Sequence, residues 1–254
     1  MQEGTAMPKQ DVVIKTRDGD CPASVFTPSN GDKWPAVIFY MDAPGVRPVL
    51  EAMAQRISDD GYVVLLPDLF YRWGPNEPVD PMKTFSTPEL RDAMMGKLGM
   101  YDLDKKNADT KAFIEYLDSR SDVAGDKFGS TGYCMGGNCS LTAAGAFPDR
   151  FAASASFHGG WIANEMPDSP HQFLPGFKGR IYVAGASDDP MFTEENKALL
   201  EKTLTDGGVD HVVETYEGAL HGFAPDDMPV YDKAASDRHW RELLKLFRET
   251  LQAS

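Results

Sequence analysis

The sequence predicts an α/β fold: a mostly parallel, eight-stranded sheet that starts with an antiparallel hairpin and carries helices on both faces. The hairpin is indicated by two β-type runs, 12–16 and 21–26, which flank an Asp-Gly pair, a strong short-range hairpin signal. Beyond a turn rich in Pro, Ser, Asn and Gly, apolar β-type runs alternate with amphipathic helical stretches. This alternation is typical of βαβ units that bury a parallel sheet on both faces.

Six further strands are expected, with helices between them. The strands cover residues 36–40, 62–67, 127–133, 151–157, 180–185 and 211–216. The helices lie near residues 49–60, 107–119, 137–147, 193–205 and 231–251, and several open with capping-type residues. Because no internal repeat or low-complexity tract interrupts the pattern, we expect a single domain over residues 1–254.

The segment 71–100 breaks this rhythm, because it contains four prolines. We interpret it as a loop or small helical excursion over one end of the sheet. Its larger apolar side chains, Trp73, Phe85, Met94 and Met95, either line an apolar wall of a cleft or form ordinary local core.

Charge and cysteine content narrow the classes of function. The chain has 39 Asp and Glu against 25 Lys and Arg, a net charge of −14, which repels phosphate backbones and anionic membrane surfaces. We therefore expect neither nucleic acid nor a membrane as a partner. The start of the chain is polar and lacks an apolar core of signal-peptide length, so a soluble, cytoplasmic protein is expected. The chain has three cysteines, an odd number that does not form a framework of paired disulfides, which favours reduced thiols.

The most informative stretch is a Gly-x-Cys-x-Gly turn, from Gly132 to Gly136, between a β-type run and a helical stretch. It matches the nucleophile elbow of hydrolases, with Cys134 in place of serine. A strained turn projects the nucleophile from the sheet edge, and the two glycines let neighbouring backbone pass without Cβ clashes. Because the next helix aims its N-terminal amides at the site, we expect the N–H of Met135 to stabilise an oxyanion. The alternative is a buried structural cysteine in a Gly-rich turn.

The order of residues along the chain favours the catalytic interpretation. In this hydrolase class the nucleophile is followed by an acid and then by a histidine. Asp188 and His221 follow the seventh and eighth expected strands, at the edge of the sheet where Cys134 follows the fifth. Asp189 competes with Asp188 as the acid, and we expect Asp188 because it lies nearer the end of its strand. His221 is the expected base, with activity falling at acid pH as it becomes protonated.

These motifs resemble those of the dienelactone hydrolase family. The resemblance rests on Gly-Tyr-Cys-Met-Gly-Gly around Cys134, on the Pro-Asp-Leu-Phe-Tyr-Arg stretch that ends at Arg72, and on the His-Gly-Phe loop at His221. It runs from about Asp11 to the end of the chain. It implies an eight-stranded α/β-hydrolase fold without a large lid, and a triad of Cys134, Asp188 and His221.

The resemblance also implies roles for two residues after the third strand. At one further position this sequence differs from the family. Family members carry a glutamate that hydrogen-bonds the resting thiol, and then a residue whose N–H is the second oxyanion donor. Here Asp42, one methylene shorter, takes the glutamate position, and Ala43 supplies the amide. Family members bind a substrate carboxylate with an arginine shortly after the catalytic histidine. At this position the present sequence has Pro225. Dienelactone itself is therefore not the expected substrate, and Arg72 or Arg47 is the alternative cation.

Four residues are candidates for contact with the substrate: Arg72, His158, Trp73 and Phe223. His158 ends another expected strand, where it is either a rival base or a residue of the cleft wall.

The sequence thus predicts a hydrolase that cleaves an ester or lactone bond of a small molecule through an acyl-enzyme on Cys134. This chemistry requires no metal and no organic cofactor, and we expect a monomer or a homodimer. Two alternatives stay open. One is a carboxylesterase or thioesterase that acts on linear substrates. The other is a catalytically silent α/β-hydrolase that serves as a binding or redox-sensing module through its thiol.

Overall fold

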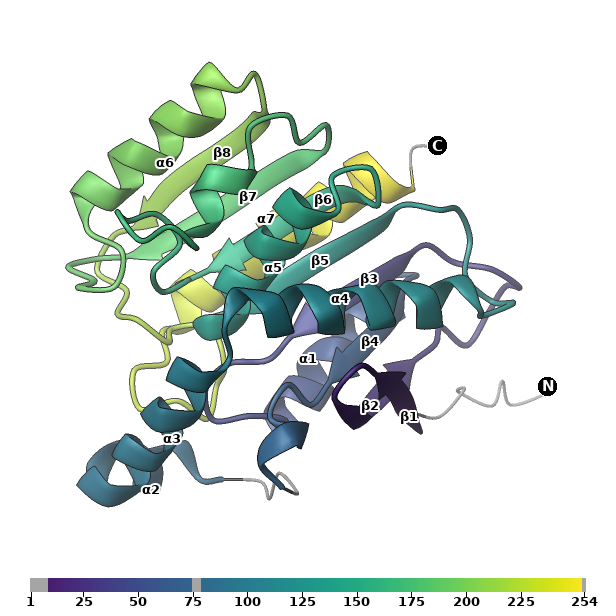
Figure 1. Cartoon of the computed structure of the whole chain (residues 1–254), viewed down its shortest axis with the longest axis horizontal. Helices are drawn as coiled ribbons and strands as arrows, with labels where there is room; N and C mark the ends of the chain where they lie inside the picture. Colours follow the sequence, from purple (N-terminus) through teal and green to yellow (C-terminus); the bar gives the residue numbers. More distant parts are fainter. Residues whose placement is uncertain (1–8, 75–78, 253–254) are drawn as a thin grey trace.

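The computed structural model describes residues 9–74 and 79–252, which are organised around an eight-stranded sheet (Figure 1). The order of the strands across the sheet is β1-β2-β4-β3-β5-β6-β7-β8. The pairs β1–β2 and β2–β4 are antiparallel, and the other neighbours are parallel. The strands are β1 (Gln10–Thr16), β2 (Gly19–Phe26), β3 (Ala36–Tyr40), β4 (Val63–Pro67), β5 (Phe128–Tyr133), β6 (Phe151–Phe157), β7 (Arg180–Ala186) and β8 (Asp210–Tyr216). The predicted fold class is confirmed, including the antiparallel hairpin at its start.

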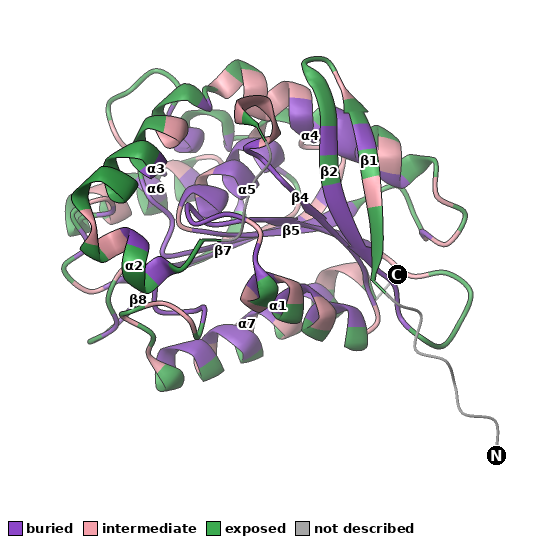
Figure 2. Cartoon of the chain, turned by 90° about the horizontal axis from the view of Figure 1, so that it is seen from below, coloured by how far each residue is buried: buried purple, intermediate pink, exposed green. Residues whose placement is uncertain are grey.

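Helices cover both faces of the sheet. Helices α1 and α7 lie on one face, and α4, α5 and α6 lie on the other (Figure 2). Between these layers, every residue of β3, β4 and β5 is buried, as expected for central parallel strands. The helices are α1 (Pro48–Asp59), α2 (Pro81–Ser86), α3 (Pro88–Met100), α4 (Leu103–Asp118), α5 (Met135–Ala146), α6 (Glu194–Asp206) and α7 (Lys233–Leu251), with short 3-10 helices η1 (Tyr71–Trp73) and η2 (Pro170–Phe173).

Capping side chains set where several of these helices begin. The carboxylate of Asp102 accepts the N–H of Lys105 at the start of α4, and the carboxylate of Asp232 accepts the N–H of Ala235 at the start of α7. Helix α4 therefore starts four residues before the position expected from its apolar pattern, because the cap and not the first apolar residue fixes its start.

The segment 71–100 is largely helical where the structure describes it. Pro81 and Pro88 stand at the first positions of α2 and α3, where proline is favoured because its missing N–H has no helical partner anyway. The two helices project from the side of the molecule toward which the arrows of β7 and β8 point (Figure 1). Residues 75–78, which include two of the four prolines, lie outside the described residues.

A buried carboxylate anchors the start and the end of this segment. Asp109 of α4 is fully buried and accepts hydrogen bonds from the hydroxyls of Tyr71 (2.9 Å) and Tyr101 (3.0 Å). Asp109 also forms a bidentate ion pair with Arg72, whose two terminal guanidinium nitrogens lie 2.7 and 2.8 Å from the two carboxylate oxygens. A buried carboxylate with this many donors is satisfied, so it holds η1 and the end of α3 against the body of the fold.

The register of the parallel strands brings the carboxyl ends of five strands to a common edge of the sheet. The pairs that show this are Tyr40–Gly132, Tyr133–Phe157, Phe157–Ala184 and Ala186–Tyr216. Residues that follow β3, β5, β6, β7 and β8 therefore meet at the carboxyl ends of the strands, where ligands bind in open α/β sheets. Within the described ranges, no helix has both the length and the apolar character needed to cross a membrane.

Candidate active site

Cys134 occupies a left-handed turn between β5 and α5. Its φ is +54°, a conformation that costs a non-glycine residue about 1–3 kcal/mol unless its surroundings impose it. Its N–H donates to the carbonyl of Phe157 and to Nδ1 of His158, both at 3.2 Å. The Cys134 residue is partly exposed, whereas Cys21 and Cys139 are buried. The geometry matches the strained turn expected from the sequence, and Cys21 and Cys139 are the buried thiols.

Two glycines allow the elbow to pack against its neighbours. A Cβ on Gly132 would lie 1.9 Å from the carbonyl oxygen of Gly136. A Cβ on Gly136 would lie 2.2 Å from the carbonyl oxygen of Tyr40. Glycine at both positions lets the start of α5 rest directly on the end of β3. The loop that follows β3, with Asp42 and Ala43, is thereby held beside Cys134.

The carboxylate that contacts His221 belongs to Asp189, which corrects the expectation of Asp188. Nδ1 of His221 donates to Oδ2 of Asp189 at 2.7 Å, and Oδ1 of Asp189 accepts the N–H of Met191 at 2.9 Å. Asp189 is buried and Asp188 is exposed. The physical reason lies in the backbone: Asp188 has a φ of +51°, so the chain turns there and the next side chain points inward.

Burial lowers the pKa of His221, but its hydrogen bond to Asp189 and the nearby Cys134 thiol outweigh burial and raise the pKa to about 10. The ring therefore holds its second proton through neutral pH. Its Nε2 has no hydrogen-bond partner in the described part of the chain and is the atom available to the thiol and to a substrate. The acid-side loss of activity expected from the sequence assumed an ordinary histidine pKa, whereas the titration of His221 is displaced to alkaline pH.

His158 is buried against the elbow, so it does not line an open cleft wall, and its Nδ1 is engaged by the Cys134 backbone. This nitrogen accepts the N–H of Cys134, so the proton of the neutral ring lies on Nε2. Burial, together with the nearby His221 and His239, lowers the pKa of His158 well below its usual range. Its ring packs against His221 and Phe223, with centroids 5.3 and 4.9 Å away.

Asp42 does not play the expected part of an acid that contacts the thiol. Its two carboxylate oxygens accept hydrogen bonds from Arg47, at 2.5 and 3.0 Å. Arg47 is itself buried and also binds the carboxylate of Asp227, at 2.6 and 2.9 Å. The physical reason is that a guanidinium five residues away matches both oxygens of the short aspartate. Arg47 is accordingly not a free cation for a substrate.

The two expected oxyanion donors are available. In the described residues, neither the N–H of Met135 nor that of Ala43 donates a hydrogen bond to a protein acceptor. Met135 is the first residue of α5, so the positive end of the helix dipole adds to its amide. Arg47 also donates to the carbonyl of Gly45 (3.1 Å) and so fixes the loop that carries Ala43.

Three further substrate candidates are occupied by packing or by ion pairs. Arg72 is tied to Asp109 and Asp18. Phe223 is fully buried under His158. Trp73 packs edge-on against Phe70 and Tyr101. The sequence could not show most of these contacts, because Asp18, Asp109, His158 and Tyr101 lie far from their partners along the chain.

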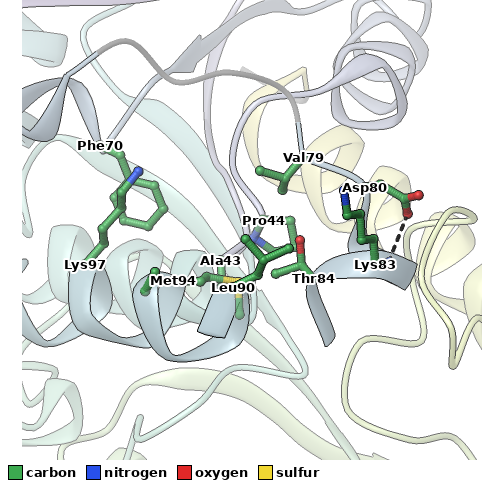
Figure 3. Close-up of a pocket in the computed structure, with 11 residues that line it drawn as sticks. Ala43, Pro44, Phe70, Val79, Asp80, Lys83, Thr84, Leu90, Met94 and Lys97 are labelled. Carbon is green, nitrogen blue, oxygen red and sulfur yellow. Dashed lines mark hydrogen bonds between the residues drawn. The ribbon is translucent and has the colours of Figure 1, made fainter. Parts of the chain in front are cut away.

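A pocket of about 440 Å³ adjoins the loop after β3 (Figure 3). Figure 3 draws Leu90 and Met94 of α3 together with Ala43 and Pro44 among the residues that line the pocket. Of the four apolar residues considered as a cleft wall from the sequence, Met94 lines this pocket, and Met95 is exposed. The remaining lining residues are Phe70, Val79, Asp80, Lys83, Thr84, Ala93 and Lys97.

Two features of the site were not anticipated from the sequence. Asp227 completes the carboxylate pair around Arg47, but the two residues are separated by 180 positions and share no motif. Gly160 lies beside His221, since a Cβ on Gly160 would be 3.9 Å from Cε1 of His221, and Trp161 follows Gly160 in the chain. No local pattern marks this loop as part of the site.

Solved structures define the class of the fold. A dienelactone hydrolase-like promiscuous phosphotriesterase from metagenomic libraries is 23% identical, with a TM-score of 0.79 over 97% of this chain and 99% of that one. A dienelactone hydrolase from Anabaena variabilis is 17% identical, with a TM-score of 0.70 over 96% and 98% of the two chains. The chain thus has the α/β-hydrolase fold.

The family follows from the sequence comparison. The model of the dienelactone hydrolase family matches residues 21–251, so this chain belongs to the dienelactone hydrolase family, and the resemblance seen in its motifs is confirmed. A relative from Synechocystis sp., whose name gives carboxymethylenebutenolidase as a provisional assignment, is 26% identical over 87% of this chain and 88% of its own length. Protein usf of Aquifex pyrophilus is 27% identical over 86% and 90% of the two chains. The chain is therefore a hydrolase of the ester- or lactone-cleaving type.

Proposed function

We propose that this hydrolase cleaves small carboxylic esters or lactones through an acyl-enzyme on Cys134, with His221 as the proton carrier and Asp189 as its partner. One observation carries the proposal. A single edge of the sheet presents a partly exposed cysteine in a left-handed turn at the start of a helix, together with a histidine held 2.7 Å from a buried carboxylate. These are the nucleophile, the base and the orienting acid that acyl transfer requires.

In the first half-reaction, the proton of Cys134 resides on Nε2 of His221, and the thiolate attacks the substrate carbonyl. An S–C bond forms, and the carbonyl π electrons move onto oxygen, which the N–H groups of Met135 and Ala43 would stabilise. The tetrahedral intermediate then collapses. The bond to the leaving group breaks, and the proton on His221 passes to the leaving oxygen or sulfur.

In the second half-reaction, neutral His221 takes a proton from water as the water attacks the thioester. The S–C bond breaks, the acid product leaves, and the proton held by His221 restores the resting pair with Cys134. Asp189 stays hydrogen-bonded to Nδ1, so that Nε2 always faces the reacting atoms.

The pocket beside the loop after β3 is the proposed site for the acyl part of the substrate. Ala43 supports this placement, because its amide is a proposed oxyanion donor and its side chain lines the pocket. Phe70, Leu90 and Met94 give the pocket an apolar wall suited to a hydrocarbon acyl group. Arg72 cannot hold an acyl carboxylate without leaving the buried Asp109.

A hydrolysis screen across lactones, aryl esters and acyl thioesters tests this function, with Cys134→Ala and Cys139→Ala as a matched pair. We expect turnover of at least one class, its loss in Cys134→Ala, and near-normal rates in Cys139→Ala, whose thiol is buried. Loss of turnover after treatment with a thiol blocker should accompany this result. Full activity in purified Cys134→Ala would refute the nucleophile. Labelling of Cys134 without hydrolysis of any substrate would favour the silent binding or redox-sensing module.

A further inference from the structure

The loop between β6 and η2 holds an aromatic residue, Trp161, in an unusual backbone conformation directly after Gly160, which lies beside His221. Trp161 has a φ of +53°, in the left-handed region that residues with bulky side chains rarely adopt. Its side chain is nevertheless not used in the core, because the residue is 43% exposed.

Hydrogen bonds from three separate places hold the Trp161 backbone in this conformation. Its N–H donates to the carbonyl of Met191 at 2.9 Å. Its carbonyl accepts Nδ2 of Asn138 at 3.1 Å and Nδ2 of Asn164 at 3.4 Å. Asn138 belongs to α5, the helix that starts at the elbow, so the position of Trp161 is fixed relative to Cys134. An exposed indole on a backbone fixed in this way points to a role in contact rather than in folding.

The loop lies on the histidine side of the reaction centre. Gly160 N–H donates to the carbonyl of Cys134 at 3.3 Å. A Cβ on Gly160 would lie 3.9 Å from Cε1 of His221 and 3.2 Å from the sulfur of Met191. Trp161 follows directly and does not line the pocket beside Ala43. The acyl pocket is thus lined by residues outside this loop, whereas the loop approaches His221 through Gly160, directly before Trp161.

The proton transfer in the proposed mechanism indicates which part of the substrate lies near His221. His221 Nε2 must deliver its proton to the leaving atom, so the leaving group has to lie next to the histidine. We propose that Trp161 determines specificity by forming a platform for the leaving group, and that the enzyme therefore favours esters of flat aromatic or extended apolar alcohols and thiols. This inference rests on the proposed acyl-enzyme function. Leu220, which directly precedes His221 in the chain, is a second exposed apolar residue.

The test compares benzyl and methyl esters of one carboxylic acid. Both esters form the same acyl-enzyme, so recognition of the leaving group affects acylation alone and appears in the ratio of their kcat/KM values. Trp161→Asn removes the ring and keeps a residue that tolerates positive φ, and Trp161→Phe retains an aromatic ring. Met166→Ala is the control, because Met166 is a 60% exposed apolar side chain of the same loop.

We expect Trp161→Asn to lower the benzyl-to-methyl ratio by about three- to tenfold, the size of one aromatic contact. The ratio should stay within about twofold of the wild type in Trp161→Phe and Met166→Ala. An unchanged ratio in Trp161→Asn, or an equal loss for both esters, would overturn the platform while leaving the acyl-enzyme intact. If the wild type hydrolyses neither ester, the inference fails; if turnover survives Cys134→Ala, the proposed function fails, and the inference fails with it.

Discussion

The choice between two adjacent aspartates depends on one backbone angle. Asp188 has a φ of +51° and is exposed, and Asp189 is buried against His221. Distance along the sequence from the end of β7 favoured Asp188, but it says nothing about which side chain a left-handed turn directs inward. Aspartate adopts this conformation more readily than most residues, so the sequence was compatible with either arrangement.

The variant pair Asp189→Asn and Asp188→Asn tests this assignment. We expect Asp189→Asn to lower kcat/KM by about a hundredfold or more, because an amide can neither fix the His221 tautomer nor stabilise the imidazolium. Asp188→Asn should change kcat/KM by less than about twofold, since its side chain is exposed. Thermal unfolding of both variants serves as the control for folding. The reverse ranking in well-folded proteins would contradict the assignment.

The pH dependence follows from the raised pKa of His221. Because that pKa is about 10, the imidazolium that protonates the leaving group is present at neutral pH and is lost as pH rises through about 10. We expect kcat/KM to hold through the range around 6.5 in which an unperturbed histidine titrates, and to fall at alkaline pH. Asp189→Asn removes a hydrogen bond and a charge that raise this pKa, so the alkaline fall should move to lower pH. An alkaline fall at the same pH in both proteins would contradict the link between Asp189 and His221.

At the scale of elements, the loop after β3 is fixed by a buried cation. Arg47 precedes α1 and joins three groups: the carboxylate of Asp42, the carbonyl of Gly45 and the carboxylate of Asp227. Burial raises the pKa of the Asp42 carboxyl even though Arg47 acts in the opposite direction. Without Arg47 the buried carboxylate would have no cation beside it, and the Ala43 amide would lose its fixed position.

Arg47→Met should therefore be strongly destabilising. We expect a loss of about 3–5 kcal/mol in the free energy of unfolding, the usual result of removing one partner of a buried ion pair. Asp227→Asn should cost about 1 kcal/mol or less, because the Asp227 side chain is 32% exposed and Arg47 keeps Asp42. Adding Asp42→Asn to Arg47→Met should recover part of the loss. Urea unfolding measures all three, and equal effects of Arg47→Met and Asp227→Asn would show that the pair with Asp42 contributes little.

The elements differ in how far their sequences predict them. Strand β3 was predicted at its observed bounds, because a short apolar run is all that a buried parallel strand requires. Helices α2 and α3 were expected only as a small excursion, because α3 buries Met94 alone and so has no apolar period. The prolines that suggested a loop at Pro81 and Pro88 instead start these helices.

At the scale of the whole molecule, parallel topology brings the site together. Cys134, His221 and the loop with Ala43 could be placed at one edge from the sequence, because each follows a strand of a parallel sheet. The ion pair of Arg47 with Asp227 could not, since it joins segments 180 residues apart through side-chain geometry. Sequence order therefore predicted which strand ends meet, and the three-dimensional packing decided which side chains at those ends make contact.

Covalent chemistry at Cys134 is the central claim, and it can be measured directly. The enzyme is mixed with an ester whose acyl-enzyme is hydrolysed slowly, and the reaction is quenched in acid within the burst phase. Peptide mass spectrometry then locates the acyl group. The account predicts the acyl mass on the peptide that contains Cys134, with Cys134→Ala carrying none, because the thioester is the intermediate of both half-reactions. An acyl group on another residue, or steady turnover with no covalent adduct, would contradict it.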